Sequence, residues 1–538
     1  MNDWQLFIDD FVIARSTGFD RVIHHPHPRG IVIDADRPWE TSGVTPIHVE
    51  RRDDGTFIAY YTAMWWDIDR AGELPPGFRE DRAHHVFHRI AYAESPDGIH
   101  WIKPILDLVE APSGIDKSRH SPYPSPDGSS THNNLGVPFV IVSDLGRHGN
   151  VDDPSMRYAL RLAPGNPGES PGVGAPWSDE PDGYFAPEIP DFIEDSAWRE
   201  RLRKCEGQFN PRRKTIHFWD GLNGEWVSID QGVTPHWLPS REIARFSSKD
   251  LDRWESMAVL YPDSSDPSNP GCYDEPMSLT PFCAEGLVFG LLSWFHSDRT
   301  YPWGGPNPEA TDDVPNIWAW CRKGTNEMRI TISRDGGRTW DRTSSREAWI
   351  PHGPEEDSLD RLVISPLPPV KVGDEDWFYV GVWDGDHLNI RNDPQNTPYV
   401  RDRPRTSRIA LYTQKHNRYV SMTAGNNPEV LITKTVAVTG SKLQLNMDSS
   451  RGSLRVGIAK SEPVMTFGDT TPSSAPHLLE DNTLPGFSID DCPPIYSNEV
   501  EHEVSFGESG ILGDLRGMDV VILFEVFNAD IYGFRFAD

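Results

Sequence analysis

Cysteine is scarce in this chain. Only five cysteines are spread over 538 residues, and no two of them form a Cys-x-x-Cys pair. An odd number cannot pair off completely within one chain, and close Cys pairs are typical of structural zinc sites. The sequence therefore predicts neither a disulfide framework nor a zinc site, and the thiols suit a reducing compartment or inert burial. The five are Cys205, Cys272, Cys283, Cys321 and Cys492.

Basic residues are in deficit. The chain holds 51 Lys and Arg against 82 Asp and Glu, which gives a formal net charge of −31 at pH 7. This charge repels phosphate backbones and anionic lipid surfaces. We therefore expect no nucleic-acid partner.

Long apolar stretches are missing. No segment approaches the roughly 20 consecutive apolar residues that a membrane-spanning helix needs, and the N-terminal MNDWQLFIDDF lacks the basic start of a secretion signal. We expect a cytoplasmic protein without membrane contact, or a secreted or periplasmic one if a leader has been removed. A monomer or a small homo-oligomer is expected.

Long amphipathic helices are also absent, and short strands take their place. The 44 Gly and 48 Pro separate runs rich in β-branched and aromatic residues. Residues 44–63, for example, read as a strand, a tight turn at 52–55 and a second strand. Five such units follow one another, and sheets of this kind can close into a ring.

One phrase recurs where these units end. It reads SPDGIHW at 95–101, SKDLDRW at 248–254 and SRDGGRTW at 333–340. We interpret it as a turn in which Asp caps the backbone, Gly adopts a positive φ and Trp packs between neighbouring sheets. SRDGGRTW matches the eight-residue Asp box of sialidases and other propellers. The repeats therefore predict architecture and not catalysis.

These patterns predict an all-β chain with two main domains. A five-bladed β-propeller is expected over residues 40–413, followed by a C-terminal β-sandwich over residues 414–538. Residues 1–39 are expected to form an irregular lead-in that closes the ring or packs on the sandwich. In a propeller the first strand of each blade lines the central channel, so polar residues at the starts of these strands converge.

Acidic residues stand at the starts of the predicted inner strands of four blades. Carboxylates crowded into one funnel repel one another, so at least one should be protonated near neutral pH, as a general acid must be. Two carboxyl groups suffice to cleave a glycosidic bond: one protonates the leaving oxygen and the other attacks the anomeric carbon or activates water. The candidate catalytic residues are Glu40, Glu206, Glu275 and Asp360.

Aromatic and amide side chains near the same strand starts would bind the sugar. Each candidate also has a structural alternative, such as capping a turn or packing between blades. Acids around an axis could hold calcium, but acids alone do not indicate it, so a metal is left open and no cofactor is expected to be required. The candidate substrate-binding residues are Trp39, His132, Asn133, Asn134, Tyr273, Asp274 and Trp294.

Several segments resemble glycoside hydrolase family 32 and its relatives in families 43 and 68. These segments are WETSG at 39–43, CEG at 205–207 and LFEVFNADIYGFRF at 523–536, while LFIDDFVI at 6–13 and GFSIDDCPPIY at 486–496 are similar to bacterial family-32-like proteins. The resemblance implies a propeller with a sandwich and cleavage of furanosides or fructosides. It places Glu40 at the position of the nucleophile and Glu206 at that of the acid/base. The chain departs from the family in blade two, where His132, Asn133 and Asn134 replace an Arg-Asp-Pro motif.

Two other functions fit part of the pattern. A sialidase-like hydrolase would need three arginines on a substrate carboxylate, and arginines do not stand at several blade starts. A non-catalytic carbohydrate-binding propeller fits the absence of the usual nucleophile and stabiliser motifs. We therefore predict a glycosidase that acts on a carbohydrate, with these two functions as alternatives.

Overall fold

The computed structural model confirms the all-β class. Its described residues form strands β1 to β28 and three short 3-10 turns, η1 (Pro38–Glu40), η6 (Ile489–Asp491) and η7 (Leu512–Leu515). No helix in the described part of the chain is long and apolar enough to cross a membrane. The structure describes residues 3–40, 43–66, 86–106, 140–144, 158–162, 218–231, 242–249, 255–263, 265–266, 273–297, 324–344, 346–355, 358–385, 406–461, 482–507 and 510–538.

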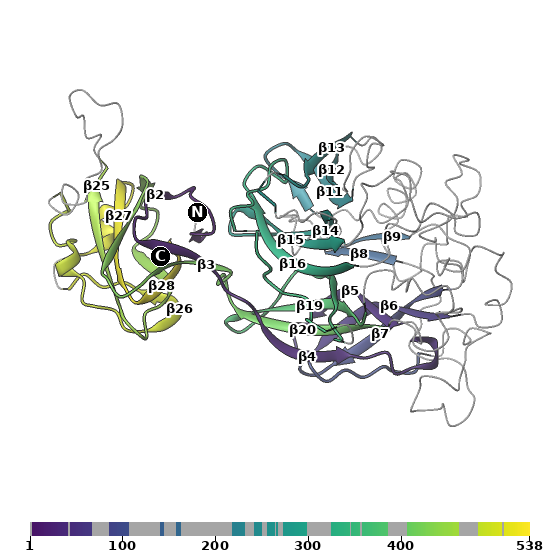
Figure 1. The fold of residues 1–538 in the computed structure, drawn as a ribbon. Coiled ribbons are helices and arrows are strands. Elements are labelled where there is room, and N and C mark those ends of the chain that lie inside the picture. The colour runs from purple at the N-terminus through teal and green to yellow at the C-terminus, as the bar shows by residue number, and fades with distance from the viewer. Residues whose placement is uncertain are drawn as a thin grey trace.

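Figure 1 shows a larger body of sheets and a smaller one that contains both chain ends. The longest sheet of the larger body consists of antiparallel groups joined by isolated parallel pairs, Asn326 with Leu362 and Ser407 with Gly43. Such sparse pairing joins separate small sheets at their edges. The groups are β14 (Tyr273–Ala284), β15 (Leu287–Ser297) and β16 (Gly324–Ser333); β17 (Leu362–Pro366), β18 (Val370–Val372), β19 (Glu375–Trp383) and β20 (Ser407–Lys415); and β5 (Gly43–Arg51), β6 (Phe57–Trp66) and β7 (Val86–Ser95).

Two further sheets belong to the larger body. One has the order β10-β11-β12-β13 and the other pairs β8 with β9. The first shares a hydrophobic core with the β14–β16 group, in which Phe218, Ile229 and Trp294 are buried. The bounds are β8 (Val140–Asp144), β9 (Tyr158–Leu162), β10 (Phe218–Asp220), β11 (Glu225–Gln231), β12 (Ile243–Ser248) and β13 (Glu255–Leu260).

The first strand of each group in the long sheet is interrupted by a bulge next to a proline. The register shifts between Pro46 and His48 in β5, between Pro276 and Ser278 in β14, and between Ile364 and Pro366 in β17. Proline lacks an N–H and is tolerated in strands mainly at edges and bulges. The shared bulge indicates that β5, β14 and β17 occupy equivalent places in their groups.

The recurring Asp-box turns have the predicted geometry in the two copies that the structure describes in full. Asp97 accepts hydrogen bonds from the backbone of Ile99 and His100, and Gly98 has a φ of 79°. A Cβ on Gly98 would lie 2.7 Å from the Tyr379 hydroxyl, so glycine is required there. Trp101 lies edge-on to Tyr379 of β19, a strand of the neighbouring group. In the other copy Asp335 accepts from the backbone of Arg338 and Thr339, and residues 250–254 of the third lie outside the described part.

The smaller body has two sheets around one core. One has the order β26-β24-β28-β21-β3, with β1 paired to β28, and the other has the order β2-β22-β27-β23, with β25 paired to β27. Buried residues of both sheets, such as Leu445, Val456, Phe524 and Phe534, form a single hydrophobic cluster. The bounds are β21 (Val420–Ala424), β22 (Glu429–Thr433), β23 (Val436–Ala437), β24 (Lys442–Asp448), β25 (Ser453–Lys460), β26 (Asn498–Glu503), β27 (Asp519–Phe527) and β28 (Ala529–Ala537).

The N-terminal residues belong to both bodies. Residues 5–33, for which the sequence predicted an irregular lead-in, contain four strands: β1 (Gln5–Leu6), β2 (Ile13–Arg15), β3 (Phe19–Ile23) and β4 (His27–Ile33). The first three pair with strands of the C-terminal sheets. β4 instead pairs with β20 in the larger body. The start of the chain thus ties the C-terminal sheets to the group that contains β20.

Candidate functional site

The open end of the β14–β15 hairpin gathers charged side chains. Asp274 is the cross-strand partner of His296, and Glu327 stands opposite Trp294 near the start of β16. Because alternate residues of a strand share a face, these side chains lie on the same side of the sheet. His296 donates from Nδ1 to Asp274 Oδ2 and from Nε2 to Glu327 Oε2, both at 3.0 Å. One imidazole thus connects two carboxylates from neighbouring strands.

The two carboxylates determine the charge of His296. Burial alone would lower the pKa of His296, but the hydrogen bonds and charges of Asp274 and Glu327 outweigh it and raise the pKa to about 9. Burial likewise raises the pKa of Glu327, yet the bond from His296 and the charge of Arg329 bring it below its usual value. At neutral pH His296 is therefore an imidazolium, and 29 % of its side chain is exposed.

The loop before β17 reaches the same place. The rings of His352 and His296 lie 6.1 Å apart in an edge-to-face contact. Next to it, Gly353 donates its N–H to the Asp360 carbonyl, and a Cβ on Gly353 would lie 2.3 Å from Asp360 Oδ1. Asp360 is half-buried. The structure therefore brings two of the predicted residues, Asp274 and Asp360, into one region.

Glu40 has a closed environment that the sequence did not predict. Its carboxylate is fully buried and accepts from Lys103 at 2.6 Å, from the Tyr61 hydroxyl at 2.8 Å, and from the N–H groups of Asp36 and Arg37. Burial is the main cause of a raised pKa at Glu40, which the Lys103 ammonium partly offsets. The expected open funnel position is not observed, because Lys103 and the surrounding backbone cover this acid. A catalytic role for Glu40 stays a prediction.

Three other predicted residues are also buried. Glu275 is 0 % exposed and, one position after Asp274, points to the opposite face of β14. Trp39 is 3 % exposed within a core cluster, and Trp294 is 0 % exposed. The guanidinium groups of Arg329 and Arg342 lie over the Trp294 ring at 4.5 and 4.6 Å. Neither tryptophan offers the open face expected for stacking on a sugar, because packing and arginine contacts already use these rings.

The remaining predicted residues are not all described. The backbone of Tyr273 pairs with Ser297, and its side chain lies outside the described part. Glu206, His132, Asn133 and Asn134 also lie outside it. The sequence prediction missed His296 and Glu327, because it looked for charged and polar site residues only at the starts of the first strands. Their signal was a charged residue at the end of 287–297 and at the start of 324–333, the strands that pair with 273–284.

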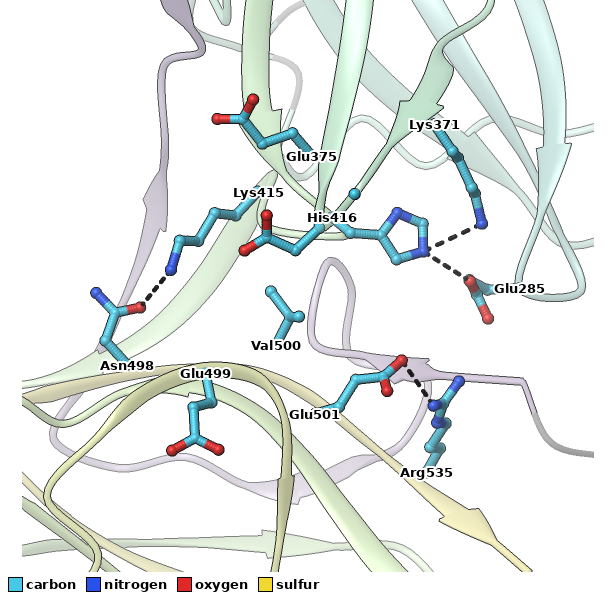
Figure 2. Close-up of a pocket in the computed structure, with 12 residues that line it drawn as sticks. Glu285, Lys371, Glu375, Lys415, His416, Asn498, Glu499, Val500, Glu501 and Arg535 are labelled. Carbon is cyan, nitrogen blue, oxygen red and sulfur yellow. Dashed lines mark hydrogen bonds and ion pairs between the residues drawn. The ribbon is translucent and has the colours of Figure 1, made fainter. Parts of the chain in front are cut away.

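A second charged region lies at the closed end of the same hairpin. A cavity of about 620 Å³ is lined there by residues of the β14–β15 turn, β18, the β18–β19 turn, the end of β20 and strands β26 and β28. Figure 2 shows His416 with Lys371 and Glu285 beside its ring, and Arg535 paired with Glu501 across the cavity. Behind the ring, His416 Nδ1 contacts Asp376 at 2.9 Å.

His416 and Glu285, which both line the cavity, determine each other's charge. Burial lowers the pKa of His416, but Asp376 and Glu285 outweigh it and raise the pKa to about 9. Glu285 accepts hydrogen bonds from the Trp4 N–H and from Asn417 Nδ2. Burial raises the pKa of Glu285, but these two bonds and the bond from His416 outweigh it and lower the pKa to about 2. In the described part of the chain, no group of three or more His, Cys, Asp or Glu side chains is arranged to hold a metal ion.

No family model and no curated protein matches the chain. Among solved structures, it matches a glycoside hydrolase with 13% identity and a TM-score of 0.34 over 73% of this chain and 93% of the other. It also matches sucrose-6-phosphate hydrolase from Lactobacillus gasseri (10% identity, TM-score 0.20, 96% and 93% covered) and exo-inulinase from Aspergillus awamori (10%, 0.26, 96% and 98%). The matched proteins are glycoside hydrolases, the class that the sequence resemblance names.

Proposed function

We propose that the chain is a glycoside hydrolase and that its reaction takes place at the open end of the β14–β15 hairpin. The observation that carries the proposal is the pair of carboxylates, Asp274 and Glu327, bridged by a partly exposed His296. Ionised carboxylates next to a half-buried third acid, Asp360, supply the charge pattern that glycoside cleavage needs.

The proposal includes the predicted architecture. Five groups of strands, β5–β7, β8–β9, β10–β13, β14–β16 and β17–β20 with β4, correspond to the five blades of a propeller. The two C-terminal sheets correspond to the β-sandwich, to which β1, β2 and β3 add strands. In this arrangement the equivalent strands β5, β14 and β17 are inner strands, and the residues at their starts face the axis.

The chemistry follows from the charges. Asp274 is held next to an imidazolium, so it acts as the carboxylate that attacks the anomeric carbon or removes a proton from the attacking water. A protonated acid on the other side of the sugar gives its proton to the leaving oxygen as the glycosidic bond breaks. Asp360 and Glu206 are our candidates for this acid, Glu206 through its position in the sequence resemblance. Furanosides and fructosides are the preferred substrates on the same ground.

Sugar release from a panel of fructosides, furanosides and pyranosides tests the proposal. Four variants test the candidate acids one at a time: Asp274→Asn, Asp360→Asn, Glu206→Gln and Glu40→Gln. Loss of an essential carboxylate should lower kcat by about 10²- to 10⁴-fold. Asp335→Asn in the Asp-box turn is the matched control and should leave kcat unchanged. No turnover of any substrate by the unmodified protein, with retained sugar binding, would favour the non-catalytic alternative.

The carbohydrate-binding alternative has one observation in its favour. Two of the four predicted catalytic acids, Glu40 and Glu275, are 0 % exposed. The sialidase-like alternative is less well supported, because Arg329 is buried against Glu327 and Arg361 donates to the carbonyls of Gly353 and Pro354.

A further inference from the structure

A row of alternating charges leads from the candidate site into the protein. Beyond Asp274, His296 and Glu327, the guanidinium of Arg329 donates from Nε to Glu327 Oε1 at 2.6 Å. Its Nη1 lies 3.9 Å from Oδ1 of Asp266, a residue of the segment that follows β13. The side chains of Arg329 and Asp266 are only 2 % and 4 % exposed. The site is therefore in electrostatic contact with a segment that does not reach it directly.

Asp266 is held firmly in this row. Both of its oxygens accept from Arg342, at 2.8 and 2.5 Å, and Oδ1 also accepts from Arg346 at 2.9 Å. Arg346 in turn pairs with Asp263 at 2.9 Å. Bidentate contacts of this kind fix the planes of both partners. Asp266 is thus the point where three guanidinium groups, those of Arg329, Arg342 and Arg346, meet.

Trp294 gives the row a rigid base. The guanidinium groups of Arg329 and Arg342 both lie over its ring, and the ring is fully buried next to His296 in the same strand. A movement of Arg342 away from Asp266 would therefore also disturb the contact that positions Arg329. Two routes, one ionic and one through the ring, connect Asp266 to Glu327.

A row of buried charges is a poor way to gain stability. Removing two charges from water costs several kcal/mol per ion, and apolar side chains of similar size often stabilise as well or better. Fully satisfied buried polar networks do, however, define one geometry. Position, more than stability, is what this row can provide.

We propose that Asp266 is a positioning residue for the candidate site and that it acts through Arg329 and Glu327 on the imidazole of His296. The inference rests on the proposed function for its catalytic meaning. Among the described residues, the charged and titratable groups that face His296 are Asp274 of β14, Glu327 of β16 and His352 of the loop before β17. Asp266 influences Asp274 and Glu327 only through the row of charges that includes Arg329.

The test is a histidine titration of the full chain by NMR, with ¹⁵N-labelled histidine and Asp266→Asn. Removing the Asp266 charge leaves the arginines to draw Glu327 away from His296. The pKa of His296 should therefore fall by about 0.5 to 1.5 units, the size of coupling that packed networks transmit. His416 has a similar pair of carboxylates and no contact with this row, so its titration should not move. His296→Gln and His416→Gln variants assign the two signals.

A second buried network supplies the matched control. Arg245 pairs with Asp220 at 3.0 Å and with Glu225 at 2.8 Å, with side-chain exposures as low as those of the Asp266 row, and within the described part of the chain neither acid contacts a histidine. Asp220→Asn should lower stability as Asp266→Asn does and leave His296 unchanged. If Asp266→Asn does not fold, Arg346→Gln, at a 30 % exposed side chain, should shift the pKa of His296 in the opposite direction by less, because it removes a positive charge from the row.

The outcomes separate this inference from the proposed function. A shift of His296 in Asp266→Asn alone supports the positioning role even if no sugar is cleaved, because the titration requires no turnover. If the unmodified protein cleaves a glycoside and His296 does not move, the positioning role is wrong and the proposed function stands. Equal shifts of His296 and His416 would also overturn it, since they would reflect general loosening.

Discussion

Two histidines stand at opposite ends of one hairpin, and each is held between two carboxylates. His296 lies between Asp274 and Glu327 at the open end, and His416 lies between Asp376 and Glu285 at the closed end. The twelve residues of β14 separate the two ends by roughly 35 Å. Both imidazoles have a pKa raised to about 9.

The two histidine sites differ in the other hydrogen-bond partners of their carboxylates. Glu285 accepts from Trp4 near the N-terminus and from Asn417 after β20, and Asp376 accepts from the Tyr419 hydroxyl at 2.7 Å. These contacts join distant parts of the chain, so the His416 triad is a joint between the two bodies. The acids of the His296 triad come from neighbouring strands of one sheet, with Asp360 nearby. A carboxylate–histidine triad alone therefore does not identify a reaction site. The further contacts of its carboxylates distinguish a reaction site from a structural connection.

We expect the largest loss of stability at the His416 triad from a change at Glu285. Glu285→Ala removes the acceptor for three donors, Trp4, Asn417 and His416, and leaves the His416 imidazolium beside the Lys371 ammonium. Removing one partner from a buried ion pair costs about 3–5 kcal/mol, and the midpoint of thermal unfolding should fall accordingly. Glu375→Ala, which changes a 30 % exposed acid of the same cavity, should cost less than about 1 kcal/mol. Equal effects of the two variants would contradict the joint.

Exchanging the two histidines for glutamine should separate turnover from stability. His296→Gln should lower kcat about ten- to a hundredfold, because Asp274 loses the group that orients it, with a modest loss of stability. His416→Gln should lower the unfolding midpoint and change kcat by less than about twofold. Steady-state kinetics and calorimetry on both variants decide this. A loss of turnover in His416→Gln alone would place the reaction at the other end of the hairpin.

The fold was more accessible from the sequence than the site. Turn dipeptides and the Asp-box phrases are local signals, and Asp97, Gly98 and Trp101 occupy the predicted turn. The all-β class follows from the same local patterns. The proline bulges could also have been read, because Pro46, Pro276 and Pro366 each interrupt a strand-like run.

The site depends on pairing between strands, which a single sequence does not contain. Asp274 was listed among substrate-binding candidates, but its partner His296 is 22 positions away and becomes its neighbour only through the hairpin register. Burial was equally hidden. Glu40 and Trp294 have the residue types of a sugar site, and only the structure shows Lys103 over the first and two arginines over the second.

Alkaline pH should weaken both triads. The folded-state pKa of each histidine, about 9, lies above the ordinary value of 6.5, so the stability it contributes is complete below pH 6.5 and is lost as the pH rises through 9. Glu285 behaves oppositely: its pKa of about 2 lies below 4.5, so its contribution is present above pH 4.5 and is lost toward pH 2. Unfolding midpoints measured from pH 3 to 10 should form a plateau between pH 4.5 and 6.5. His296→Gln and His416→Gln should each reduce the loss of unfolding free energy at alkaline pH by on the order of 1–2 kcal/mol. An unchanged loss in both variants would contradict the raised pKa values of the two histidines.

Asp335 caps a turn and contacts no histidine among the described residues, so it is the reference for both triads. Asp335 accepts from the N–H groups of Arg338 and Thr339, and from the hydroxyls of Ser333 and Thr339, at 2.7 to 3.1 Å. Asp335→Ala should cost about 1 kcal/mol, the usual net loss when a turn loses its side-chain acceptor, and should leave kcat unchanged. Thr339→Val, which removes only the hydroxyl bond, should cost about half as much. If either variant lowered kcat as His296→Gln does, the Asp-box turn would belong to the reaction site and the contrast between the triads would lose its reference.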